Sequence, residues 1–145
     1  MRRWQWVALP LLVAACVPTA RTAGPYAAKA VKTADVVRSA IESDLLVLEA
    51  VQKGRTIATY VSVATSDAED HASSAGSTFL SIQPPDDDSE RLRDDLSKLV
   101  TDAEDVLGEA RIAGRRGDRD ALLFTRAGLQ RAADALDRFS EEHRG

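Results

Sequence analysis

The sequence has few of the residues that build cross-linked, glycosylated or metal-binding folds. Cysteine occurs once in 145 residues, so no disulfide can form within the chain. Asparagine is absent, which excludes an N-glycosylation sequon. Beyond residue 16 the only aromatic residues are Tyr26, Tyr60, Phe79, Phe124 and Phe139. A core made mainly of alanine, valine and leucine suits closely spaced helices better than a sandwich of sheets.

The same shortages argue against an enzyme. The serines lack a nearby base that could activate them as nucleophiles, and residues 114–118 have neither the glycines nor the Lys-Ser/Thr pair of a P-loop. Metal sites in ferritin-like bundles need a Glu-x-x-His on each of two helices, whereas Ala68 lies three residues before His71 and His143 lies near the C-terminus. We therefore expect no catalysis, no cofactor and no bound metal.

Two acidic clusters leave ion binding open. Asp67 and His71 are four residues apart, so they share a helix face and could pair. Asp86, Asp87 and Asp88 could hold a hard cation, but the segment lacks the central glycine and the length of an EF-hand loop. Acidic residues at the start of a helix favour capping as their role.

The first sixteen residues have the order of features of an export signal. Arg2 and Arg3 form a positive head, residues 4–13 are mostly apolar, and two small residues precede the single cysteine. The apolar run is interrupted by Pro10 and is too short to cross a bilayer, which needs roughly 20 apolar residues.

The last four of these residues, Val13-Ala14-Ala15-Cys16, resemble the lipobox of bacterial lipoprotein precursors. In that family a diacylglyceryl group is attached to the cysteine sulfur and the chain is cut just before it. The resemblance implies that residues 1–15 are a signal peptide and that Cys16 is the lipidated first mature residue. Two acyl chains hold a protein stably at a membrane where one is marginal. A secretory signal with a free Cys16 and a short cytosolic apolar N-terminus are the alternatives.

Four segments after the expected tether of residues 16–25 show helical periodicity, with apolar residues three and four apart. The first covers residues 26–53 and ends at Gly54, and the second ends before Pro84-Pro85. Residues 57–65 also fit an alternating strand, although helix is favoured. Asp87 and Glu90 have the spacing of a capping box before the third segment, and Asp118 can cap the fourth.

The residues expected to face the core follow from this periodicity. They are Ala30, Ala34, Val37, Ile41, Leu45 and Leu48, then Ile57, Val61, Ala64, Ala68, Ala72, Ala75, Phe79 and Ile82, then Leu92, Leu96, Leu99, Ala103, Val106, Ala110 and Ala113, and finally Leu122, Leu129, Ala132, Leu136 and Phe139. The connections at Gly54, Pro84-Pro85 and residues 114–117 are short. The sequence therefore predicts one all-α domain over residues 26–145, an antiparallel up-down four-helix bundle that follows a cleaved signal.

In such a bundle the turns at Gly54 and at residues 114–117 share one end. The basic residues near them are Lys53, Arg55, Arg111, Arg115, Arg116 and Arg119. The other end would carry the acidic 83–88 loop and the C-terminus. This polarity predicts contact between the basic end and an anionic cell-wall polymer or an acidic protein partner. Compensation of helix dipoles is the alternative explanation for the arginines.

Together these features predict a lipoprotein anchored to the extracytoplasmic face of the cell membrane, acting as a binding or adaptor module of the cell envelope. Loss of Arg2 and Arg3 leaves 17 of the 19 basic residues against 23 acidic ones, a net charge of −6, which argues against nucleic acid as a partner. The alternative is a sensor or carrier with a small-ligand pocket in the bundle core. The small side chains of residues 73–77 would allow close helix packing or leave a groove.

Overall fold

The computed structural model describes residues 22–144, and all regular secondary structure within this range is helical. The helices are α1 (Ala23–Gln52), α2 (Ala58–Leu80), α3 (Asp87–Arg116), α4 (Arg119–Phe124) and α5 (Arg126–His143). The all-α prediction is confirmed, and residues 57–65 are the N-cap and first turns of α2, not a strand. The predicted signal peptide, the lipobox and Cys16 lie outside the described residues. None of the described helices is long and apolar enough to span a bilayer.

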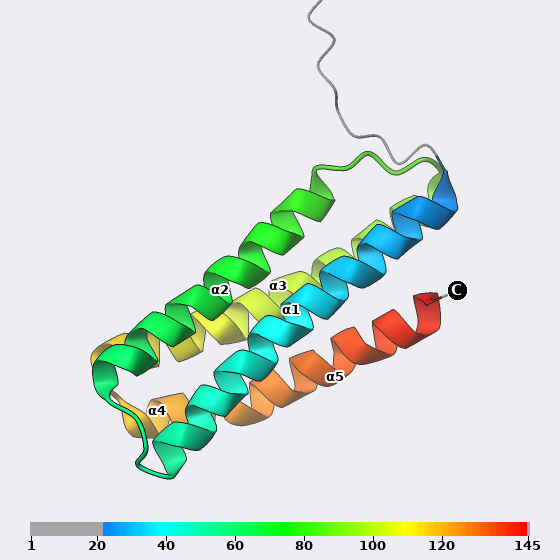
Figure 1. The fold of residues 1–145 in the computed structure, drawn as a ribbon. Coiled ribbons are helices and arrows are strands. Elements are labelled where there is room, and N and C mark those ends of the chain that lie inside the picture. The colour runs from blue at the N-terminus through cyan, green and yellow to red at the C-terminus, as the bar shows by residue number, and fades with distance from the viewer. Residues whose placement is uncertain (1–21, 145) are drawn as a thin grey trace, which may run out of the picture.

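The four long helices lie side by side in a bundle-like fold (Figure 1). Helix α1 packs against α2, α3 and α5, whereas α2 and α5 do not touch each other. Ten residues of α1 are buried, more than in any other helix. Helices α1 and α3 therefore separate the two outer helices and carry most of the core between them.

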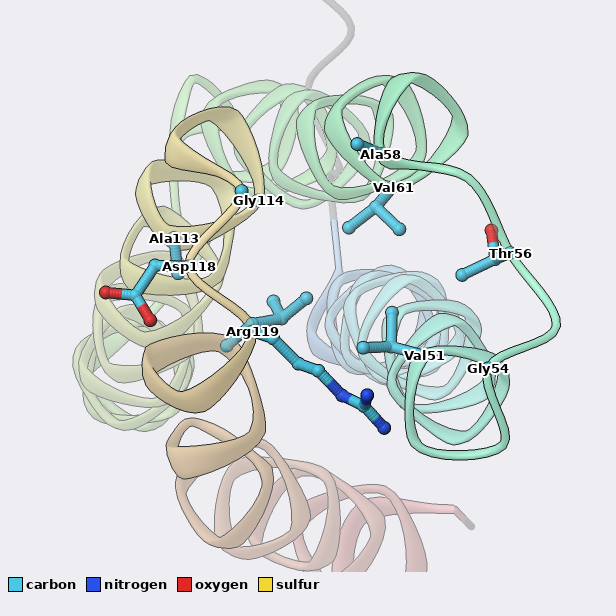
Figure 2. Close-up of a pocket in the computed structure, with 11 residues that line it drawn as sticks. Val51, Gly54, Thr56, Ala58, Val61, Ala113, Gly114, Asp118 and Arg119 are labelled. Atoms are coloured by element: carbon cyan, nitrogen blue, oxygen red, sulfur yellow. The ribbon is translucent and has the colours of Figure 1, made fainter.

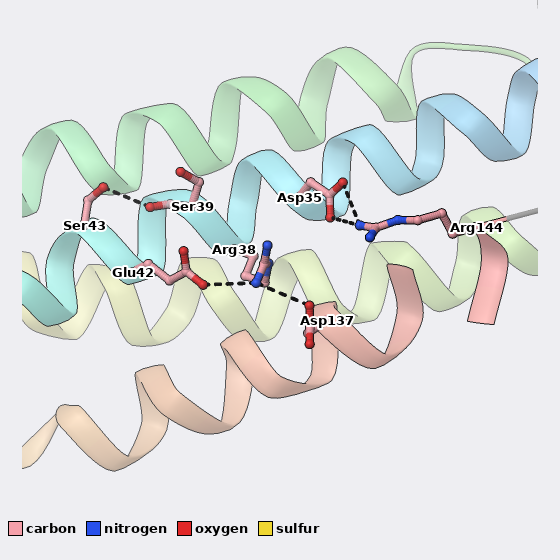
Figure 3. A network of polar contacts seen from close by, with 7 residues as sticks. All are labelled: Asp35, Arg38, Ser39, Glu42, Ser43, Asp137 and Arg144. Carbon is pink, nitrogen blue, oxygen red and sulfur yellow. Dashed lines mark hydrogen bonds and ion pairs between the residues drawn. The ribbon is translucent and has the colours of Figure 1, made fainter. Parts of the chain in front are cut away.

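Polar contacts on the surface join α1 to α5 (Figure 3). The Arg38 guanidinium lies 3.3 Å from the Asp137 carboxylate and 3.1 Å from that of Glu42. Arg144, just after α5, donates to Asp35 at 3.0 Å. Exposed ion pairs of this kind each contribute at most about 1 kcal/mol. Burial of the core residues therefore contributes most of the free energy that holds α1 and α5 together, and the ion pairs contribute little of it.

The buried face of α3 is rotated from the predicted one. Leu96, Ala103, Ala110 and Ala113 are buried as expected. Val100 and Leu107 are buried in the places expected for Leu99 and Val106, which with Leu92 are only half-buried. The buried positions keep a seven-residue repeat, at 96, 103 and 110 and at 100, 107 and 114, so the core face is offset from the predicted one by a constant angle. Apolar residues occupy both neighbouring positions in two places, Leu99 with Val100 and Val106 with Leu107, so the pattern alone does not select the buried one.

The predicted fourth helix is divided at Thr125 into α4 and α5. The Thr125 hydroxyl donates to the Leu122 carbonyl at 2.7 Å, and its backbone N–H contacts the same oxygen at 3.2 Å. A threonine hydroxyl that competes for a backbone acceptor disturbs helical geometry locally. Leu122, Leu129, Leu136 and Phe139 are buried as predicted, and Ala133 replaces Ala132 as the buried alanine.

The ends of α1 and α3 differ slightly from expectation. Helix α1 begins at Ala23, inside the expected tether. The N-cap of α3 is Asp86, whose carboxylate accepts from the Ser89 N–H at 2.9 Å, so the predicted capping box is wrong by one residue. Gly114 lies within α3, and only Gly117 adopts the left-handed conformation that ends it.

Small residues in α2 bring this helix close to α3. A Cβ atom built on Gly76 would lie 2.6 Å from Cγ1 of Val100, well inside van der Waals contact. Ala72 and Gly76 are buried, while Ser73, Ser74 and Ser77 are exposed. The small residues of this segment therefore permit close packing against α3, and Ser74 and Ala75 also line an open groove between α2 and α1, so both alternatives occur.

We predict that Gly76→Ala destabilises the fold by about 1 kcal/mol. The strain of overpacking costs roughly 1–3 kcal/mol and outweighs the gain of about 1 kcal/mol in helix propensity. Gly108→Ala is the matched control, because its Cβ would meet only the far end of the Glu69 side chain, at 3.3 Å. Chemical denaturation should show a loss of stability for the first variant and none for the second. Equal stability of the two variants would contradict the close approach at Gly76.

Candidate functional site

Five of the six basic residues singled out in the sequence lie around two helix-ending turns at one end of the molecule. Lys53 and Arg55 flank the turn after α1, and the other three, Arg115, Arg116 and Arg119, flank the turn after α3. Residues 49–56 and 115–126 contain six basic and three acidic residues, and residues 57–66 contain none of either kind. We call this region the basic end, defined by Lys53, Arg55, Arg115, Arg116, Arg119 and Arg126.

Arg111 does not belong to this group. Its guanidinium forms an ion pair with Glu69 of α2, and both side chains are about three-quarters buried. The pair therefore joins α3 to α2 and is not presented to a partner. Arg126, which the sequence analysis did not select, lies at the basic end because the break at Thr125 starts a new helix there.

The basic side chains of the basic end differ in their ion-pair and hydrogen-bond partners. Lys53 pairs with Glu49, one turn earlier on α1. Arg119 and Arg126 both reach Gln52, the first donating to its backbone carbonyl at 3.0 Å and the second to its side-chain oxygen at 3.2 Å.

Arg55, Arg115 and Arg116 are exposed, and the ion pairs formed within residues 22–144 include none of them. Helix termini bind cations through their carbonyl dipoles, and Arg119 illustrates this role at the end of α1. The arginines without a partner in this range leave the positive charge of the basic end accessible to an anion.

A cavity of about 200 Å³ opens among these turns (Figure 2). Its walls come from the ends of α1 and α3, the start of α2, and α4. The lining residues are Val51, Gly54, Thr56, Ala58, Val61, Ala113, Gly114, Gly117, Asp118, Arg119 and Leu122. Most of this surface is aliphatic or glycine backbone, so the cavity favours an apolar group.

Two glycines in the left-handed conformation shape the mouth of the cavity. Gly54 has φ +64° and Gly117 has φ +65°, values that other residues adopt only with strain. After the second glycine, the Asp118 carboxylate accepts from the Ala121 N–H at 3.0 Å and starts α4. Figure 2 shows this carboxylate turned away from the cavity, while the Arg119 side chain extends across it toward α1.

Large apolar side chains are exposed beside the cavity. Ile57 was expected to face the core, but it is the N-cap of α2 and is 72 % exposed, between the lining residues Thr56 and Ala58. Tyr60 is 57 % exposed one turn later. Phe124 is also 87 % exposed, but it lies two residues after the lining Leu122 and therefore on the opposite side of α4. Exposed apolar side chains near charged ones mark an interaction surface.

The two acidic clusters considered as ion sites in the sequence, Asp67 with His71 and residues 86–88, do not form such sites among the described residues. No ion pair joins the exposed residues Asp67 and His71 within the described part of the chain, and Asp86 caps α3. Asp88 pairs with Arg91 on the first turns of the same helix. Between residues 22 and 144, no group of three or more His, Cys, Asp or Glu side chains is placed to hold a metal ion.

Comparison with known proteins gives no relative for this chain. No protein-family model, no curated protein and no solved structure matches it. The chemistry of the described residues is therefore the basis on which the site is interpreted.

Asp44 is a residue that the sequence analysis missed. It lies on the core face of α1 between Ile41 and Leu48, and all three side chains are fully buried. Neither carboxylate oxygen has a hydrogen-bond partner. Burial alone raises the pKa of Asp44 from 3.8 to about 7. Helical spacing places position 44 on the core face, because it follows Ile41 by three residues. An acidic side chain is not expected in a core, so the sequence did not predict its burial.

The raised pKa links folding to pH with a definite sign. Between pH 3.8 and pH 7 the folded protein holds a proton on Asp44 that the unfolded chain has lost. Stability therefore falls as the pH rises through this window and is lowest above pH 7. A shift of about three pKa units corresponds to about 4 kcal/mol over the whole window.

We predict that the free energy of unfolding falls by on the order of 2–3 kcal/mol between pH 5 and pH 8 because of Asp44. Asp44→Asn removes the titrating group and should abolish this part of the pH dependence. The exposed Asp134→Asn variant is the control and should retain it. Denaturant titrations at the two pH values measure the difference, and identical pH profiles for the wild type and Asp44→Asn would refute the assignment.

Proposed function

We propose that this protein is a lipoprotein anchored through Cys16 to the extracytoplasmic face of the cell membrane, where its basic end binds another component of the envelope. The observation that carries the proposal is the gathering of positive charge, an apolar cavity and exposed apolar side chains at one end of the described fold. This combination supports a binding or adaptor module. The lipobox-like residues at positions 13–16 support the anchor.

We further propose that the helices form an antiparallel, up-down four-helix bundle. Three contacts support this arrangement. Tyr26 at the start of α1 stacks on Phe79 at the end of α2, with ring centroids 5.1 Å apart. Asp35 in the first half of α1 pairs with Arg144 just after α5. Residues from the end of α1 and the start of α2 line a common cavity.

This topology gives the molecule a direction relative to the membrane. The chain that leads from Cys16 enters α1 at its first residue, Ala23, at the end opposite the basic end. Residues 86–88, Glu141 and Glu142 add negative charge at the anchored end. The cations there, which offset part of it, are Lys29, Lys32, Arg91, Arg93 and Arg144. Anionic lipid headgroups repel the negatively charged end of the protein that lies next to the membrane. This repulsion favours an upright molecule whose basic end points away from the membrane.

A carrier for a small ligand is the second candidate function, and the cavity supports it. An engineered cavity of about 150 Å³ in another protein holds a benzene molecule, so about 200 Å³ is sufficient for a small apolar ligand. The cavity lies at the basic end and not in the middle of the core, so such a ligand would lie beside Arg119.

We predict that the exported protein carries a diacylglyceryl group on the sulfur of Cys16 and begins at that residue. Cys16→Ala should release the protein from the membrane fraction, because it removes the sulfur that would carry the acyl chains. Mass spectrometry of the mature N-terminus and fractionation of cells check both statements. An unmodified thiol, or an N-terminus at another residue, would remove the anchor from the proposal.

We predict that replacing Arg115, Arg116 and Arg119 with serine weakens retention on anionic envelope material roughly tenfold, since each exposed charge pair contributes up to about 1 kcal/mol. A triple serine variant at Lys32, Lys98 and Arg138 removes the same charge away from the basic end and serves as the control. Retention should be measured at low and high salt. Retention that is insensitive to salt and equal for both variants would refute binding through the basic end.

A further inference from the structure

We infer that the cavity at the basic end receives one apolar side chain from an acidic segment of a partner protein, and that Arg119 pairs with a carboxylate of that segment. The inference rests on the proposed function in one respect, the use of the basic end as the binding surface. It adds the chemical class of the partner and the residues that recognise it.

The shape and lining of the cavity favour an apolar group of limited size. Val51, Val61 and Leu122 provide branched aliphatic walls, and Ala58 and Ala113 complete them. A volume of about 200 Å³ exceeds the roughly 150 Å³ that holds a benzene ring. One leucine, methionine or phenylalanine side chain therefore fits, and a folded helix or strand does not.

Arg119 is the charged side chain that extends across this cavity in Figure 2. It is exposed and makes a single hydrogen bond, to the Gln52 carbonyl. A guanidinium has five donor N–H groups, so most of its donors remain accessible. Its planar fork matches the two oxygens of a carboxylate. The cavity and this arginine together fit an apolar side chain with an acidic neighbour.

The surroundings favour a protein over an anionic wall polymer. Arg55, Arg115 and Arg116 add exposed positive charge next to the cavity and select an acidic partner by charge complementarity. Ile57 and Tyr60 add exposed apolar area on the segment that lines the same cavity. Aromatic residues and arginine are enriched in protein interfaces. A polymer of phosphates or sugars has no apolar side chain to fill the cavity or cover these residues.

Synthetic probes test the inference on the full exported protein, held in lipid nanodiscs. The probes are a short peptide with a central leucine flanked by glutamates, the same peptide with serine in place of leucine, and poly(glycerol phosphate). Isothermal titration calorimetry measures each affinity. The leucine peptide should bind about tenfold or more tightly than the serine peptide, because burial of the aliphatic side chain distinguishes them.

Two matched pairs of variants locate the binding. Ala58→Leu fills the cavity from its wall, whereas Thr59→Leu adds the same side chain at an exposed neighbouring position that does not line it. The first should abolish the preference for leucine and the second should leave it unchanged. Arg119→Gln should weaken the leucine peptide about tenfold, and Arg116→Gln, which removes the same charge, should weaken it clearly less. Thermal unfolding establishes that each variant is folded.

Equal affinities for the leucine and serine peptides would overturn the inference, as would no peptide binding at all. Binding of poly(glycerol phosphate) that exceeds peptide binding and ignores Ala58→Leu would identify a polymer partner instead. These outcomes are independent of the anchor. A free thiol at Cys16 would refute the membrane location but leave peptide binding unaffected, whereas equal peptide affinities in a lipidated protein would refute only this inference.

Discussion

The packing of α1 against three neighbouring helices is the constraint on which the rest of the described structure depends. Its buried face is built from residues such as Ala30, Ala34 and Val37, whose small volume lets α2, α3 and α5 approach closely. Gly76 extends the same principle to the contact between α2 and α3. Because interiors are packed at crystal-like density, these positions fix the spacing of the helices and the alignment of their ends.

Asp44 lies on this same buried face of α1 and destabilises it. A fully buried carboxyl group without a hydrogen-bond partner costs free energy that the surrounding aliphatic residues must offset. The cost is smallest when the group is neutral, which is why its pKa lies near 7. The contribution of Asp44 to the free energy of unfolding is therefore least unfavourable when the group is protonated.

Much of the fold follows from the sequence, and its errors have physical causes. Periodicity located all four long helical segments, and the glycine at position 54 marked a true helix end. It misplaced part of the core face of α3, because Leu99 and Val106 are as apolar as Val100 and Leu107, which are buried instead, and it did not reveal the break at Thr125. For the candidate site, charge near the turns identified Lys53, Arg55 and the three arginines of the α3–α4 connection. Helical spacing places position 44 on the core face of α1, but an acidic side chain is not expected in a core. The pairing of Arg111 with Glu69 depends on a tertiary contact that no local pattern contains.

The division of the last helical segment has a consequence for how this surface could diversify. Helix α4 has six residues, begins at its own cap and ends where α5 starts afresh. Insertions or substitutions between Gly117 and Thr125 would change one wall of the cavity at the basic end, while the long helices would keep their register. A short element with its own cap can therefore change its sequence while the long helices and their core stay as they are.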